Sequence, residues 1–208
     1  MPDETTETTA DDARENVNEA PAPSDEVAAA AVERFESLVA FDSLGQAVLY
    51  SDRETWLDLA RWLRDEQQFE ACIDLCGVDH LLNAARLVPD GVTPERFEVV
   101  ANFRSIARNR RIRAICEVPQ DDAVVPSMTE VYPGADWPER ETYDLFGIVF
   151  DGHPDLTRIL LPEDWEGYPL RKDAATARVP VKFKGPATTP FQQARDAAVG
   201  LPKRRDAR

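Results

Sequence analysis

The residues best suited to acid–base chemistry or metal binding lie on one predicted helix: Glu139, Arg140, Glu141 and Asp144. Two carboxylates could share a proton or bind a metal ion if both faced the same space. Glu139 and Glu141 differ by two residues, however, so their side chains point about 160° apart on a helix. A two-carboxylate catalytic site is therefore not expected here.

Arg140 and Asp144 stand one helical turn apart, at the i, i+4 spacing that allows an ion pair. The charged residues of this helix have two interpretations. A solvated helix face is the simpler one, because exposed ion pairs contribute little to stability. The alternative is a polar docking surface, whose charges find partners on another protein.

Thiols and imidazoles offer a second kind of chemistry. The chain has three cysteines and two histidines: Cys72, Cys76, Cys116, His80 and His153. An iron–sulfur cluster normally needs four thiolates, and the spacing matches neither a zinc motif nor a glycine-rich dinucleotide motif. We therefore expect no cofactor or metal in this chain. The cysteines are predicted as buried, reduced thiols, His80 as a surface or capping residue, and His153 as a hydrogen-bonding residue of a turn or an interface.

Charge is unevenly distributed along the 208 residues, whose net charge is −15. Residues 1–26 carry nine acids and one arginine, residues 27–170 carry 27 acids and 13 arginines, and residues 171–208 carry three acids and ten lysines or arginines. Such an acidic protein is a poor ligand for nucleic acid. The five arginines between positions 104 and 113 therefore indicate a hairpin with solvated or partner-facing charges. The basic C-terminal segment favours an acidic partner surface.

No apolar run exceeds six residues, whereas a membrane-spanning helix needs about 20. The acidic N-terminus also lacks the basic and apolar stretches of a secretory signal. We expect a chain that neither spans a bilayer nor carries such a signal.

Periodicity predicts the elements that position these residues. Apolar residues at helical spacing predict helices over residues 24–40 and 51–68, each begun by a serine cap. Short apolar runs predict strands over residues 46–50 and 69–76, and Gly77 is expected to end the second strand.

The clearest pattern is the alternation of apolar residues over positions 97–103 and again over 112–118. Together with the polar residues between them, it predicts an antiparallel hairpin. Further along, the spacing of Asp136 and Glu139 predicts a capping box. The helix that follows should end near Gly147.

This order of elements predicts an α+β fold, with helices packed on a mixed or antiparallel sheet. We expect one domain over residues 27–170. Residues 1–26 are too polar to form a core and are predicted as a disordered acidic tail. Residues 171–208 are predicted as an extended basic tail.

A specific resemblance runs through residues 45–173. It is carried by the segments Glu139–Glu141, Asp144–Ile148, Gly152–Leu156, Arg158–Leu160 and Pro169–Asp173, and upstream by Ser105, Asn109, Arg111 and Arg113. These residues resemble the signature of the 30-kilodalton-type subunit family of respiratory complex I. The chain departs from the family pattern at Thr157, where a basic residue is usual, and at Tyr168, where histidine is usual.

The resemblance implies a non-catalytic, hydrophilic subunit of a proton-translocating NADH:quinone oxidoreductase. Such a subunit lies in the peripheral arm, on the cytoplasmic side of the cell membrane, which it contacts only through the complex. It docks on the 49-kilodalton-type subunit and lies near iron–sulfur subunits. The complex uses NAD, FMN, iron–sulfur clusters and quinone, none of which this chain would hold. The signature residues would form the interface: Glu139, Arg140, Glu141, Asp144, His153, Arg158, Arg171, Lys172 and Asp173.

Two other functions are weighed against this one. A related membrane-bound hydrogenase or formate-hydrogen-lyase complex contains a homologous subunit. An unrelated soluble enzyme with one perturbed carboxylate would need to be active as an isolated chain.

Overall fold

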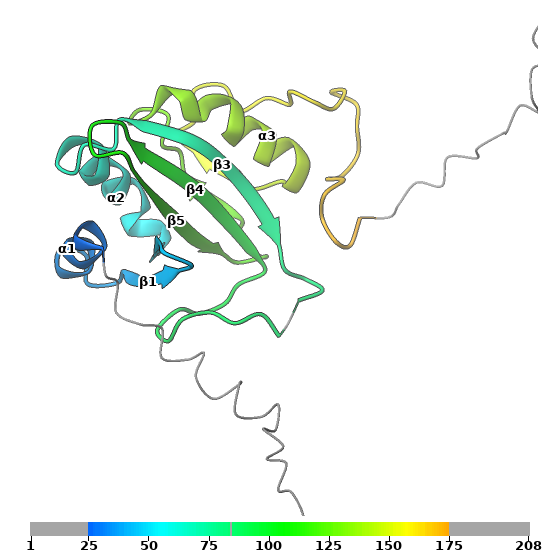
Figure 1. Ribbon diagram of the computed structural model, residues 1–208. Helices are drawn as coiled ribbons and strands as arrows, with labels where there is room; N and C mark the ends of the chain where they lie inside the picture. The colour runs from blue at the N-terminus through cyan, green and yellow to red at the C-terminus, as the bar shows by residue number, and fades with distance from the viewer. Residues whose placement is uncertain (1–24, 84, 175–208) are drawn as a thin grey trace, which may run out of the picture. The chain divides into compact units, whose positions relative to one another are not determined.

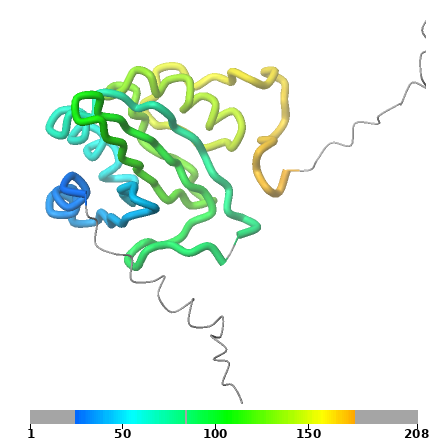
Figure 2. Tube along the Cα trace, in the orientation of Figure 1, coloured from blue at the N-terminus to red at the C-terminus, as the bar shows by residue number. Residues whose placement is uncertain are grey.

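A five-stranded mixed sheet forms the centre of the structure, with the strand order β1-β2-β5-β4-β3. The computed structural model describes residues 25–83 and 85–174 (Figures 1 and 2). The elements, in chain order, are α1 (Glu26–Arg34), β1 (Val39–Ser43), β2 (Gln46–Ser51), α2 (Arg53–Asp65), β3 (Ala71–Asp79), β4 (Phe97–Ser105), β5 (Arg110–Val118), β6 (Val124–Pro126), the 3-10 helix η1 (Pro133–Ala135), α3 (Asp136–Phe146) and β7 (Val149–Asp151). The predicted α+β class with helices on a mixed sheet is confirmed.

The predicted hairpin is confirmed as β4 and β5, which pair from Phe97 opposite Val118 to Ser105 opposite Arg110. Their alternate side chains are buried, as the alternation required. β2 pairs with β5 in the parallel sense, whereas the other strand pairs of this sheet are antiparallel. This one parallel pair makes the sheet mixed.

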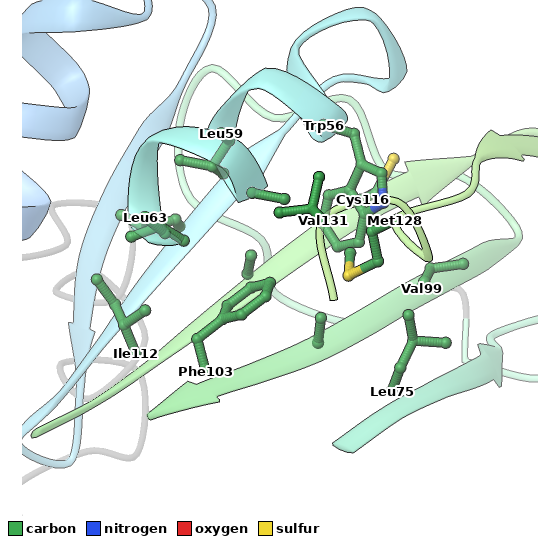
Figure 3. Packing of buried hydrophobic residues seen from close by; sticks show 14 of the residues in the cluster. Trp56, Leu59, Leu63, Leu75, Val99, Phe103, Ile112, Cys116, Met128 and Val131 are labelled. Carbon is green, nitrogen blue, oxygen red and sulfur yellow. The ribbon is translucent and has the colours of Figure 1, made fainter. Parts of the chain in front are cut away.

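The core lies between the sheet and the helices. Trp56, Leu59 and Leu63 of α2 are buried against the strands that carry Phe103 and Ile112 (Figure 3). These three α2 residues recur at helical spacing, so one face of the helix is apolar. Figure 1 shows α3 running beside β3, at the edge of the sheet far from β1.

The predicted helix over residues 24–40 is too long. α1 ends at Arg34, and Val39 begins β1, which pairs with β2 through the turn at Leu44 and Gly45. Both turn residues have positive φ, 54° and 80°, so the chain reverses there and a hairpin replaces the expected helix end.

Gly77 does not end β3 but lies inside it, opposite Val99. A Cβ atom at this position would come within 2.9 Å of Thr142 Cγ2 and 3.0 Å of the Phe146 ring. The glycine therefore allows α3 to approach the sheet closely.

Both predicted capping boxes are wrong. Asp52, and not Ser51, caps α2 by accepting the Thr55 N–H at 2.7 Å. α3 follows η1 and has no side-chain cap, although it does end at Gly147, as expected. The N-terminal tail lies outside the described residues except for Asp25, which caps α1, and Glu26, its first residue. Of the predicted C-terminal tail, only residues 171–174 are described.

Candidate functional site

The signature segment is organised around the fully buried carboxylate of Asp144 on α3. One oxygen accepts the Arg158 guanidinium at 2.7 Å. The other accepts the backbone N–H groups of Ile159, Leu160 and Leu161 at 3.1, 2.8 and 2.9 Å. Burial alone would raise the pKa of Asp144, but these hydrogen bonds outweigh it and lower the pKa below its ordinary value. The carboxylate thus holds an irregular stretch of chain against α3.

Glu139 is also fully buried, and it ties the start of α3 to the turn after β6. Its two oxygens accept the Ser127 hydroxyl at 2.6 Å and the Met128 N–H at 2.8 Å. Burial, together with the nearby charge of Asp136, raises the pKa of Glu139 to about 7. Glu139 is therefore an internal residue and not part of a solvated or partner-facing helix surface.

The predicted pair between Arg140 and Asp144 is wrong, because the Asp144 carboxylate is occupied by the segment after β7. Arg140 instead donates to the carbonyl and the hydroxyl of Thr157, at 3.1 and 2.8 Å. Its guanidinium also lies 5.8 Å from the centre of the Trp137 ring. Glu141 is exposed while Glu139 is buried, so the two carboxylates lie on different sides of α3, as their spacing predicts.

His153 is buried in the turn that follows β7. Its Nδ1 accepts the Asp155 N–H at 3.0 Å, and its Nε2 lies 3.2 Å from the Asp136 carboxylate. These contacts join the turn to the first residue of α3. The imidazole side chain has no exposed surface, so it supports the turn from within.

Arg171 closes the far end of the segment. Its guanidinium lies 5.1 Å from the Phe97 ring centre and 4.6 Å from that of Tyr168, and it donates to the Phe146 carbonyl. Tyr168 in turn packs on Gly147, whose positive φ of 72° and missing Cβ make room for the ring. This segment therefore packs against both the end of α3 and β4.

The next two residues of the signature contact β3 and the residue that precedes β4. The Lys172 N–H donates to the Asp79 carboxylate at 2.8 Å, and the Asp173 carboxylate lies 2.8 Å from the Arg96 guanidinium. Burial opposes ionisation of Asp79, but Arg96 and the backbone donors prevail and lower its pKa to about 2. The signature charges thus hold the segment in place by contacts within the chain.

The segment exposes large apolar side chains to solvent beside charged ones such as Glu163, Asp164 and Glu166. Four large side chains on α3 and on the segment lying along it are exposed: Trp137 (65%), Leu160 (58%), Trp165 (45%) and Leu170 (47%). We call these four residues the α3 surface. Exposed aromatic and aliphatic side chains grouped on one structural unit are typical of a protein interface. The sequence prediction assigned the interface to the charged residues, of which Glu139 and Asp144 are buried while Glu141, Lys172 and Asp173 are exposed.

A second polar cluster was missed by the sequence analysis. Glu98 and Glu117 face each other across β4 and β5, and both carboxylates bind the Arg86 guanidinium. His80 Nε2 lies 3.0 Å from Glu98, and the His80 side chain is only 17% exposed. Of the two predicted roles, surface or capping residue, the first is therefore wrong. The strand alternation places the two glutamates on one face, but nothing in the sequence shows that Arg86 neutralises them.

The thiols differ from one another in burial. Cys116 is buried and Cys72 is half-buried, but Cys76 is exposed, contrary to the prediction. Burial raises the pKa of Cys72 to about 12. Within residues 25–83 and 85–174, no three histidine, cysteine or carboxylate side chains come together as metal ligands would. In the same part of the chain, no helix combines the length and apolar character needed to cross a bilayer.

Comparison with known proteins places the chain in a class, the subunits of respiratory NADH dehydrogenases. Residues 49–179 match the family described as "Respiratory-chain NADH dehydrogenase, 30 Kd subunit". The chain belongs to this family, and the predicted family membership is confirmed.

Relatives named as the C subunit of NADH-quinone oxidoreductase support the assignment. The protein of Saccharopolyspora erythraea is 45% identical over 153 residues, which cover 73% of this chain and 58% of that protein. The protein of Streptomyces coelicolor is 43% identical over 143 residues, or 68% and 53% of the two chains. The chain thus spans somewhat more than half the length of these relatives.

Two solved structures resemble the fold. A trypsin-resistant fragment (1-134) of Nqo5 is 31% identical, with a TM-score of 0.53 over 63% of this chain and 95% of that one. A chain of the membrane-bound sulfane sulfur reductase, an archaeal respiratory membrane complex, has a TM-score of 0.60 over 88% and 95% of the two chains. Its identity is 18%, so this second likeness concerns the fold alone.

Proposed function

We propose that the chain is a non-catalytic subunit of the peripheral arm of a proton-translocating NADH:quinone oxidoreductase. Family membership and the names of the relatives support this proposal. In this proposal the chain supports electron transfer from NADH to quinone on the cytoplasmic side of the cell membrane. It holds no NAD, FMN, iron–sulfur cluster or quinone, all of which belong to other subunits.

The α3 surface carries the docking, in this proposal on the 49-kilodalton-type subunit. The observation behind it has two parts. The buried ion pair of Asp144 with Arg158 and the contacts of Arg171 with the Phe146 carbonyl and the Tyr168 ring fix a segment with little regular structure. This segment and α3 together expose two tryptophans and two leucines. A preorganised surface binds with little loss of conformational entropy. Tryptophan at the centre of an interface commonly contributes about 2 kcal/mol or more.

Substitution of the exposed tryptophans tests this assignment. Trp137→Ala and Trp165→Ala should change the stability of the free chain only modestly, because the two residues are 65% and 45% exposed. Each should weaken retention in the affinity-purified complex by about 30-fold, the equivalent of about 2 kcal/mol. NADH:quinone activity of membranes should fall in parallel.

Leu44→Ala is the matched control, since Leu44 is fully exposed in the β1–β2 turn at the other edge of the sheet. Retention of the tryptophan variants equal to that of Leu44→Ala would show that the α3 surface is not the interface. Stoichiometric iron or flavin in the purified chain would contradict the non-catalytic role.

A hydrogenase-type or formate-hydrogen-lyase complex is the second candidate. The electron donor that the purified complex oxidises distinguishes an NADH:quinone oxidoreductase from a hydrogenase-type or formate-hydrogen-lyase complex. Oxidation of NADH supports the proposal, and oxidation of formate or evolution of hydrogen without NADH oxidation supports the alternative.

A further inference from the structure

The tip of the β4–β5 hairpin holds two arginines directly opposite each other, Arg104 and Arg111. Their neighbours Phe103 and Ile112 point into the core, so the two arginines project from the other face of the sheet. Like charges at opposed positions destabilise a strand pair. A negative charge close to both guanidinium groups would offset this repulsion.

No such charge is provided by the residues that the structure describes. Arg110 and Arg113 on the same strand have partners, but the guanidinium groups of Arg104, Arg111 and the exposed Arg108 of the turn make no ion pair or hydrogen bond with any described residue. We call these three residues the hairpin arginines. The adjacent carboxylate of Glu70 accepts the backbone N–H of Ile106 at 2.9 Å and binds none of them.

The chain enters the domain at this hairpin. Arg110 binds both Asp25, which caps α1, and Glu26, whose carboxylate lies 3.0 Å from the guanidinium. Residues 1–24, which come directly before, contain seven acids and one arginine. Five extended residues span about 17 Å, whereas neighbouring strands are about 5 Å apart. Residues 20–24 carry no acid, so Glu19 is the first acid that this length of chain brings within reach of the hairpin arginines.

We propose that the acidic segment 1–24 lies against the hairpin arginines and neutralises them. A tethered segment acts at an effective concentration in the millimolar range, so a weak ionic contact suffices. The contact covers the basic end of an otherwise acidic domain and is sensitive to salt. The proposal does not depend on the function proposed above.

Arginine-specific modification by phenylglyoxal, followed residue by residue with mass spectrometry, tests the contact. The full chain is compared with a variant lacking residues 1–19 and with a full-length variant whose seven acids in that stretch are changed to Asn or Gln. Both variants keep Asp25 and Glu26, and hence the cap of α1. At about 10 mM salt, the hairpin arginines should react roughly three- to tenfold faster in both variants, and at about 0.5 M salt the difference should vanish.

Arg34 and Arg61 are the controls, because both are exposed and belong to α1 and α2. An equal change at these two arginines would reveal only a general effect of net charge and would overturn the proposal. Equal rates at the hairpin arginines in all three proteins would overturn it as well. So would a change confined to the basic residues 178–208, because the acidic segment would then pair with the C-terminal segment. Protection that persists after the deletion would show another occupant, a second copy or a partner, and would also overturn it.

Discussion

The guanidinium of Arg158 donates to the carboxylate of Asp144 at 2.7 Å, and this carboxylate has no surface exposed to water. Its second oxygen accepts three consecutive backbone N–H groups, those of residues 159–161. A carboxylate with this many donors resembles a helix cap, although the chain it caps is irregular. Asp144 therefore fixes the conformation of the signature segment.

Asp144→Ala should destabilise the isolated chain by about 3–5 kcal/mol, because it leaves the Arg158 charge partly buried without its partner. Unfolding by urea, monitored by circular dichroism, measures the change. Because the pKa of Asp144 is lowered in the folded chain, the stability it contributes is present above the pKa of the unfolded state and is lost in acid, as the pH falls through the folded pKa.

Glu141→Ala is the matched control for this substitution, since Glu141 is an exposed carboxylate on the same helix. It should change the free energy of unfolding by no more than about 0.5 kcal/mol. Similar effects of the two substitutions would contradict the role given to Asp144.

Arg140→Ala should cost the isolated chain about 1 kcal/mol, because its two bonds to Thr157 are exposed to solvent. Thr157→Val removes the hydroxyl acceptor but keeps the carbonyl, and should cost less. If Arg140 also contacts the partner subunit, Arg140→Ala should lower retention in the complex while Thr157→Val does not. Equal retention of the two variants would limit Arg140 to its contact with Thr157.

Glu139 should make stability fall as the pH rises. Burial raises its folded pKa to about 7 from an ordinary value of 4.5, so the folded chain binds the proton more tightly than the unfolded chain does. The contribution is complete below about pH 4.5 and is lost between there and pH 7. At about 1.4 kcal/mol per pKa unit, the loss is roughly 2–4 kcal/mol.

Glu139→Gln keeps the size of the side chain and removes the titration. The free energy of unfolding of this variant, measured by urea at about pH 5 and about pH 7.5, should change less than that of the unmodified chain. The difference between the two proteins isolates Glu139 from all other titrating groups. An identical pH dependence of both proteins would disprove the raised pKa.

Much of the fold can be predicted from the sequence, because local patterns of apolar residues determine its strands and helices. Buried apolar residues recur at every second position along β4 and β5, and the buried face of α2 repeats at helical spacing. The wrong predictions concern positions where a contact with a residue distant in the sequence determines the local structure. Gly77 was expected to end a strand because glycine is a weak strand former, whereas its role is to admit α3.

The candidate site was less predictable for the same reason. Helical spacing suggested that Asp144 pairs with Arg140, but donors 14 to 17 residues further on occupy its carboxylate. The resemblance singled out this segment without showing which of its residues are exposed. Only the packing separates the buried charges from Trp137 and Trp165, which face solvent.

Two glycines with similar backbones allow the packing of Tyr168 to be tested directly. Gly147 and Gly152 have φ values of 72° and 81°, so alanine at either position has the same left-handed conformation and costs about 1 kcal/mol for that reason. A Cβ at Gly152 meets nothing within 4 Å, whereas one at Gly147 collides with the Tyr168 ring. Gly147→Ala should therefore be more destabilising than Gly152→Ala by about 1–3 kcal/mol, the usual cost of overpacking.

The extra cost should depend on the tyrosine ring. In a chain that already carries Tyr168→Ala, the collision is absent, and Gly147→Ala should cost about as much as Gly152→Ala does, roughly 1 kcal/mol. Urea unfolding of the single and double variants gives this coupling energy. Additive effects of the substitutions at 147 and 168 would mean that the ring does not pack on Gly147. A clear coupling would show that Tyr168, which stands where the family usually has histidine, holds the signature segment against the end of α3.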